Sequence, residues 1–137
     1  GPLTALLPAG AELWLDGGHN ANAAEAVSIA AARVADGRPI DLILGMLENK
    51  DADAMIERFA PIARSLTAVP VPGHPHHAPA DLAGRARLAG LAGSEAADLP
   101  TALAAIRADA GMSPVVLILG SLYLAGTALE ANDELPD

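Results

Sequence analysis

Short apolar runs that alternate with helix-patterned segments constrain the fold of this 137-residue chain more than any other feature of its sequence. Residues 12–16, 40–44 and 115–119 are short, mostly apolar and bounded by turn residues, as buried strands are. Between these runs, apolar side chains recur at helical spacing. Strands that alternate with helices indicate βαβ units. We therefore predict a single α/β domain with a mostly parallel sheet and helices on both faces.

Weaker patterns place the remaining elements. Helices are expected over residues 20–35, 52–60, 81–89 and 101–110 and from Ser121 onward, with further strands at 66–71 and near Leu91. Asp81 is expected to cap the third helix. Helical spacing predicts the buried faces of the first two helices, which are Ala23, Val27, Ala30 and Val34 in the first and Ala52, Met55, Ile56 and Phe59 in the second.

Composition and charge disfavour several classes of function. The formal net charge is −9, the eight basic residues form no cluster, and only 2% of the residues are aromatic, so nucleic-acid binding is disfavoured. The apolar runs fall well short of the ~20 residues of a membrane-spanning helix. The chain has no cysteine and its first residues do not resemble a secretory signal, so we expect a cytoplasmic protein with no membrane partner.

The stretch LDGGHN, residues 15–20, joins the first predicted strand to the first predicted helix. Asn20 can cap that helix, whose first turn would point free N–H groups and a positive dipole end at an anion. His19 could then donate a hydrogen bond to the anion, while Asp16 could accept one from a hydroxyl pair such as that of a ribose. The alternative is that these residues only shape a turn, because Gly, Asp and Asn are ordinary turn residues.

Two further polar residues follow predicted strands in the same way. Lys50, the only lysine of the sequence, follows the second apolar run, and Ser121 follows the run 115–119. Because the carboxyl ends of parallel strands share one edge, we expect Asp16, His19, Lys50 and Ser121 to approach that edge. Lys50 could bind a phosphate or be a solvated residue at a helix start. Ser121 could donate to a carboxylate or cap a helix.

Three of the four histidines, His74, His76 and His77, lie in the proline-rich stretch 72–79. Imidazole is a common metal ligand, but a proline-rich loop without cysteine is not a preformed metal site. We therefore expect a solvated loop and no metal. The sequence also contains no P-loop, so a phosphate cradle for any nucleotide bound at the predicted edge would have to come from elsewhere.

Three motifs in order resemble one family. Residues 15–20 are similar to the LDGAHN signature of folylpolyglutamate synthase and dihydrofolate synthase, members of the Mur ligase superfamily. Residues 45–47 followed by 49–51 are similar to the family's GM(L)…DKD segment, and residues 119–126 are similar to its GSLYLAG segment. The resemblance covers residues 1–137 and is to the family's C-terminal domain, a Rossmann-like α/β unit that follows an ATPase domain.

The resemblance implies ATP-dependent amide-bond formation. In such ligases a carboxylate of dihydropteroate or of a folate is phosphorylated to an acyl phosphate, which the amino group of L-glutamate then attacks. Asp16 and Asn20 would contribute to ATP binding, and His19 would be catalytic, near the transferring phosphoryl group and the incoming glutamate. Ser121 would help to bind glutamate, and Lys50 would lie at the active edge. The ATPase domain, absent from these residues, would bind most of the ATP and Mg²⁺, so the domain alone is expected to be inactive.

Three positions depart from the family pattern. Gly18 stands where the family usually has Ala, and Ala21 and Asn49 replace the usual Pro and Asp. Loss of Pro at the first helical position weakens helix preorganisation. The alternatives to a folate ligase are a non-catalytic nucleotide- or ligand-binding module that kept the fold, and a peptidoglycan Mur ligase domain. The GSLYLAG match argues against the peptidoglycan ligase.

Overall fold

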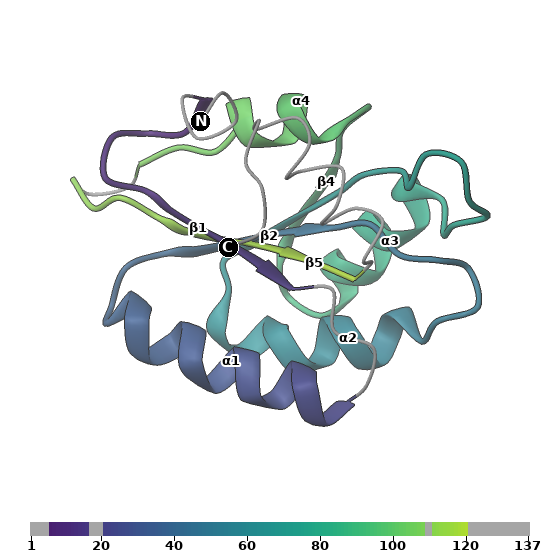
Figure 1. The fold of residues 1–137 in the computed structure, drawn as a ribbon, viewed down its shortest axis with the longest axis horizontal. Helices are drawn as coiled ribbons and strands as arrows, with labels where there is room; N and C mark the ends of the chain where they lie inside the picture. Colours follow the sequence, from purple (N-terminus) through teal and green to yellow (C-terminus); the bar gives the residue numbers. More distant parts are fainter. Residues whose placement is uncertain (1–5, 17–20, 109–110, 121–137) are drawn as a thin grey trace.

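The computed structural model describes residues 6–16, 21–108 and 111–120. Within them, strands and helices alternate along the chain (Figure 1). The elements are β1 (Glu12–Asp16), α1 (Ala21–Ala35), β2 (Ile40–Leu44), α2 (Ala52–Phe59), the 3-10 helix η2 (Ala60–Ile62), β3 (Ser65–Ala68), α3 (Pro79–Leu88), β4 (Ala92–Glu95), α4 (Leu99–Ala104) and β5 (Val115–Leu119).

The strands form one five-stranded sheet in the order β1-β5-β2-β3-β4, and every pair is parallel. The predicted α/β fold with a parallel sheet is therefore confirmed. Every residue of β2 and β5 is buried, because both strands lie inside the sheet and are covered on both faces. This double burial explains why their sequences are continuous apolar runs rather than alternating patterns.

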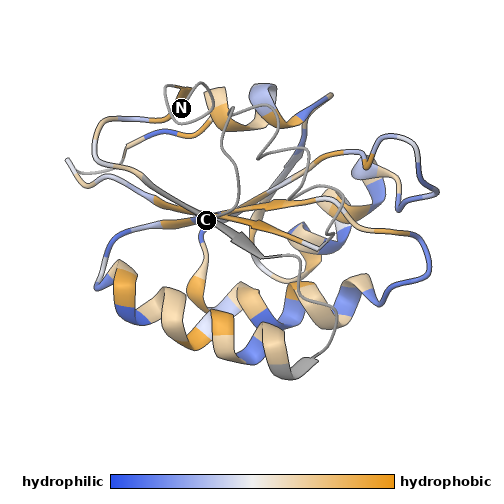
Figure 2. Cartoon of the chain, viewed as in Figure 1, coloured by the Kyte–Doolittle hydropathy of each residue, from blue (hydrophilic) through white to orange (hydrophobic). Residues whose placement is uncertain are grey.

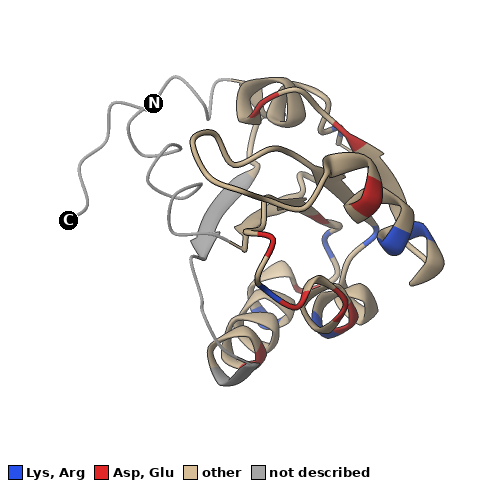
Figure 3. Ribbon diagram, turned by 90° about the vertical axis from the view of Figure 1, so that its right-hand side faces the viewer, with Lys and Arg blue, Asp and Glu red and all other residues tan. Residues whose placement is uncertain are grey.

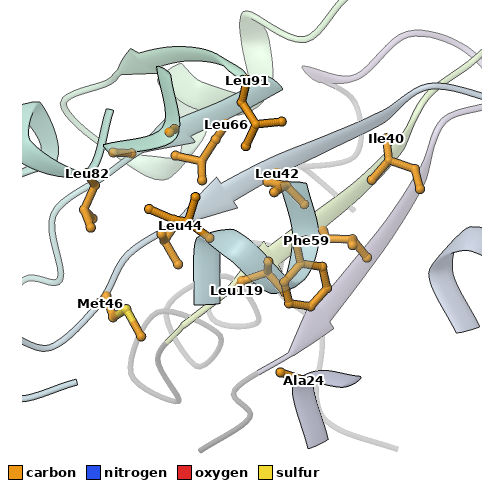
Figure 4. Close-up of a cluster of buried hydrophobic side chains, with 14 of the residues drawn as sticks. Ala24, Ile40, Leu42, Leu44, Met46, Phe59, Leu66, Leu82, Leu91 and Leu119 are labelled. Carbon is orange, nitrogen blue, oxygen red and sulfur yellow. The ribbon is translucent and has the colours of Figure 1, made fainter. Parts of the chain in front are cut away.

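Helices cover both faces of the sheet, as predicted. On one face α1, α2 and α3 pack against Leu42 and Leu44 of β2 and Leu119 of β5, with Phe59 fully buried among them (Figure 4). On the other face α4 packs against alternate strand residues, including Ile43. Figure 2 shows the central strands as apolar and the helices as a mixture of apolar and polar residues. The layers place the loops that follow the strands along one edge.

The predicted buried face of α1 is wrong by one residue. Val34 is 37% exposed and Val27 is half-buried against the core, whereas the buried residues in the described part of this helix are Ala24, Ser28, Ala31 and Ala35. Both faces of this alanine-rich helix are apolar at helical spacing, so periodicity alone could not choose between them. The structure buries the smaller side chains, which let the helix lie close to the sheet, and the Ser28 hydroxyl is satisfied by donating to the Glu25 carbonyl at 2.8 Å. In α2 the predicted Ala52, Ile56 and Phe59 are buried.

Three other boundaries differ from the prediction. β3 ends at Ala68, short of Pro70, which cannot donate to a strand ladder. α3 begins at Pro79, so Asp81 lies in its first turn rather than at its cap. α4 ends at Ala104 instead of near residue 110. None of the described helices combines the length and apolarity needed to cross a membrane.

Candidate active site at the carboxyl edge of the sheet

The three strands that precede the sequence motifs are neighbours in the sheet. Asp16 of β1 is in register with Leu119 of β5, and Leu119 is in register with Leu44 of β2. Beyond the last register pair, the Gly45 N–H donates to the Leu119 carbonyl at 3.2 Å. The carboxyl ends of all three strands therefore lie side by side at one edge, which is where open α/β sheets bind ligands (Figure 1).

Gly120 lets the ends of β5 and β2 come this close. Its φ is +106°, a conformation that other residues rarely adopt. A Cβ atom at this position would lie 2.6 Å from the Gly45 carbonyl oxygen and 2.8 Å from Leu44 Cδ1. The glycine that opens the GSLYLAG-like motif is therefore required by the backbone geometry of the edge.

Several of the predicted site residues lie outside the described part of the chain. His19, Asn20 and Ser121 are among them, and of Asp16 only the backbone, at the end of β1, is described. α1 begins at Ala21, five residues after the end of β1, so the predicted order of a strand followed by a helix is confirmed, while residues 17–20 between them lie outside the described part of the chain. The amino end of α1 thus follows directly on the candidate edge.

Lys50 lies in the loop between β2 and α2, and it is exposed. Its N–H donates to the Leu47 carbonyl at 3.1 Å, which closes a turn. The following residue, Asp51, is the N-cap of α2, and its carboxylate accepts from the Ala54 N–H at 3.0 Å. The backbone on either side of Lys50 is therefore ordered by hydrogen bonds.

The histidine-rich stretch is bonded to the Lys50 loop, which sequence reasoning missed. The His77 N–H donates to the Met46 carbonyl at 2.9 Å, and the Glu48 N–H donates to the Pro75 carbonyl at 3.2 Å. The two segments also form an isolated antiparallel bridge. One signal was available: the stretch follows β3, and a parallel strand beside β2 opens its loop at the same edge.

The imidazole rings of this loop bond to backbone oxygens. His77 Nε2 lies 2.8 Å from the Lys50 carbonyl, and His76 Nδ1 lies 2.8 Å from the His74 carbonyl. Across the described residues, no group of three or more His, Asp or Glu side chains is arranged to hold a metal ion. The described contacts of this loop with the Lys50 loop are the hydrogen bonds given above.

An ion-pair network ties together the two helices that follow these loops. Arg85 of α3 donates to Asp53 of α2 at 2.7 Å and to Asp81 of its own helix at 2.9 Å. The hydrogen bond to Asp53, followed by that to Asp81, raises the pKa of Arg85 above its usual value. Acidic residues outnumber basic ones in the chain as a whole, and both kinds occur in and around these helices (Figure 3). An anion at the edge would therefore need local donors or cations to offset the acidic charge.

A separate hollow of about 530 Å³ lies toward the amino ends of β2, β3 and β4. At its wall Arg64 forms two 2.9 Å hydrogen bonds to the buried carboxylate of Asp41, which also accepts from Ser65 at 2.5 Å. Arg64 further donates to the Arg107 carbonyl at 2.6 Å. These contacts join the start of two strands to the segment after α4, at the opposite end of the sheet from the motifs.

Comparison with known families decides the assignment of the chain. Residues 5–122 match the family model described as Mur ligase, glutamate ligase domain. The chain belongs to this family. The match spans the strand-to-helix joint after β1, the Lys50 loop and the end of β5, so the edge described above lies within the family's domain.

A curated relative and several solved structures agree with the family assignment. The chain is 37% identical over 111 residues to folylpolyglutamate synthase from Lacticaseibacillus casei, an alignment that covers 81% of this chain and 24% of the relative. The Mycobacterium tuberculosis folylpolyglutamate synthase complexed with ADP and AMPPCP superposes with a TM-score of 0.75 at 23% identity, covering 91% of this chain and 30% of that one.

A second solved structure is similar to the chain in fold. The bifunctional folylpolyglutamate synthase/dihydrofolate synthase from Yersinia pestis, complexed with AMPPNP and Mn ion, has a TM-score of 0.73 at 24% identity, and it covers 88% of this chain and 28% of that one. These structures share the fold. The chain spans about a quarter of the length of the curated relative that it matches.

Proposed function

We propose that this chain is the C-terminal domain of an ATP-dependent ligase that adds L-glutamate to dihydropteroate, to folates or to both. The observation that carries the proposal is the meeting of three motif-bearing strand ends at one edge in a member of the glutamate ligase domain family. An ATPase domain elsewhere in a longer chain would complete the site. The relatives' names, which are those of folate ligases, supply the substrate class.

The proposed reaction has two steps. ATP phosphorylates a carboxylate of the pterin or folate substrate to an acyl phosphate, and the amino group of L-glutamate then attacks the acyl carbon and displaces phosphate. Such chemistry depends on stabilising charge on the transferring phosphoryl group and on positioning the amine. Both requirements are met by donors that a domain brings to the substrate as it closes and excludes water.

Each polar residue of the edge has a role in this proposal. Asp16 and Asn20 contact the ATP ribose or adjoining groups, and His19 lies near the phosphoryl group and the incoming glutamate. Ser121 donates to the glutamate carboxylate, and Lys50 adds positive charge at the same edge. The pairing of β1, β5 and β2 supports these roles because it brings together the strand ends from which these residues follow.

The proposal assigns Mg²⁺ to the ATPase domain. A hard cation of this kind prefers carboxylate and other oxygen ligands. In the loop after β2, the Asp51 carboxylate is already used as a helix cap, and the other carboxylate, that of Glu48, lies in the same loop as the Lys50 cation. This domain would then bind ATP through hydrogen bonds. We place the reaction in the cytoplasm.

The proposal is tested by ATP-dependent incorporation of labelled L-glutamate. Protein made from the complete reading frame is expected to convert dihydropteroate or a folate to its glutamate adduct and to release ADP, whereas residues 1–137 alone are expected to form none. Omission of ATP is the control. A complete protein that binds nucleotide but ligates no glutamate would identify a non-catalytic binding module instead. Turnover by residues 1–137 alone would overturn the proposal that an ATPase domain is needed to complete the site.

A further inference from the structure

The loops after β2 and β3 form one bonded unit above the carboxyl edge. Met46, at the base of the first loop, is buried at 4% exposure and packs with Leu44 in the core (Figure 4). Its carbonyl accepts the His77 N–H at 2.9 Å. The second loop is therefore anchored to the core through the base of the first, and the positions of the two loops depend on each other.

The His77 ring contacts the backbone of Lys50 directly. Its Nε2 lies 2.8 Å from the Lys50 carbonyl oxygen. A carbonyl oxygen can only accept, so Nε2 carries the proton and donates. The Lys50 N–H is held by the Leu47 carbonyl, and the next residue caps α2. Lys50 is thus fixed through its backbone on both sides while its side chain is exposed.

The neighbouring ring does not share this role. His76 Nδ1 bonds to the His74 carbonyl, within its own loop, at 2.8 Å. His76 therefore provides a matched control. It lies beside His77, and within the described residues its side chain makes no recorded hydrogen bond to the Lys50 loop.

We propose that His77 is a positioning residue for Lys50, and that the Lys50 ammonium binds a phosphoryl or carboxylate oxygen of a substrate at the carboxyl edge. This inference rests on the proposed ligase function. A lysine side chain is long and flexible, so its charge is useful at a defined point only if its backbone is fixed. Glu48 and Asp51 lie in the same loop, so a fixed backbone also sets the point from which the Lys50 side chain extends relative to these carboxylates.

The test uses three substitutions of His77 in protein made from the complete reading frame. His77→Gln keeps a side-chain N–H donor near the position of Nε2, His77→Met has similar length and no donor, and His77→Ala removes the side chain. We expect kcat/KM for glutamate ligation to fall about tenfold in His77→Met and His77→Ala and to be largely restored in His77→Gln. His76→Ala should remain close to wild type. Melting temperatures show which variants are folded, and the Gln and Met pair decides the result even if His77→Ala does not fold.

A double-mutant cycle links the effect to Lys50. Lys50→Ala should reduce kcat/KM in the wild-type background and have much less effect in the His77→Met background, because the two changes remove the same interaction. Additive effects, or equal activity of the Gln and Met variants, would overturn the positioning role while leaving the ligase function standing. A wild-type protein without ligation would overturn the proposed function and this inference with it.

Discussion

At the scale of single residues, two contacts shape the candidate edge. Gly120 lets the ends of β5 and β2 approach, and His77 holds the backbone at Lys50. The sequence pattern did not indicate that either residue determines the structure of the edge. Both act through the backbone, one by lacking a Cβ atom and the other by donating to a carbonyl.

Substitution of Gly120 should lower the free energy of unfolding by more than the loss of its positive-φ conformation alone explains. Gly120→Ala places a methyl group 2.6 Å from the Gly45 carbonyl oxygen, whereas Gly37→Ala, at a similar positive φ of +87°, meets nothing within 4 Å. We expect Gly120→Ala to lower the free energy of unfolding by about 1–3 kcal/mol more than Gly37→Ala does, as overpacking typically costs. Urea unfolding of both variants measures the difference. Equal losses would show that the close approach of the two strand ends carries no strain.

Sequence reasoning could identify chemical groups but not their contacts. Lys50 stood out as the only lysine after a predicted strand, and the structure places it in a loop at the carboxyl end of β2. The bond from His77 could not be foreseen, because it joins residues 27 positions apart through an irregular loop. The roles of Asp16, His19, Asn20 and Ser121 stay predictions.

At the scale of elements, local signals located the buried strands well. β2 and β5 begin and end where the sequence predicted, because each is an apolar run bounded by turn residues and buried on both faces. The face of α1 was missed, because alanines lie on nearly every side of it and only packing against the sheet selects one. The strand β3 ends before Pro70, because proline cannot donate to a strand ladder, whereas α3 begins at Pro79, because proline suits the first turn of a helix.

The edge strand β4 is protected from pairing with a further strand. Arg87 of α3 donates to the Gly93 carbonyl of β4 at 2.9 Å. A Cβ atom on Gly93 would lie 2.3 Å from the Ala83 carbonyl oxygen and 2.9 Å from Arg87 Cγ, so the glycine lets α3 pack closely and Arg87 reach the strand. A short strand with a charged side chain bonded to its backbone is a poor template for adding another chain.

The cap of α4 gives a prediction about pH. Asp98 accepts the Thr101 N–H at 2.8 Å. Hydrogen bonding from the Thr101 side chain, followed by that from the Thr101 N–H, lowers the pKa of the Asp98 carboxyl group below the ordinary value of 3.8. A carboxyl group whose pKa is lower in the folded protein than in the unfolded chain stabilises the fold when the pH is above the pKa of the unfolded chain. This stabilisation is lost as the pH falls through the pKa of the folded protein. Asp98→Asn, which keeps an acceptor that does not titrate, should therefore be less stable than wild type at neutral pH.

The difference in stability between wild type and Asp98→Asn should shrink once the pH falls below 3.8. Urea unfolding of the two proteins across this range measures it. A difference that stays constant with pH would mean that the charge of Asp98 does not contribute to the cap.

At the scale of the whole molecule, strand order creates the candidate site. β5, the last described strand, lies between β1 and β2, so motifs more than 100 residues apart in sequence open at one edge. The sequence predicted a parallel sheet and a shared edge, because alternating strands and helices imply both. It could not predict which strands are neighbours, since that order arises from packing between distant segments.

The proposed function depends most on the claim that His19, in the segment that follows β1, takes part in ligase chemistry. The most direct measurement is the turnover of glutamate ligation by His19→Ala in the complete protein, made together with its melting temperature and with His76→Ala as the control. Loss of a group that stabilises the transferring phosphoryl charge should lower kcat about 100-fold while the melting temperature stays near that of wild type. Unchanged turnover with a large fall in melting temperature would contradict the claim and make His19 a structural residue of the turn.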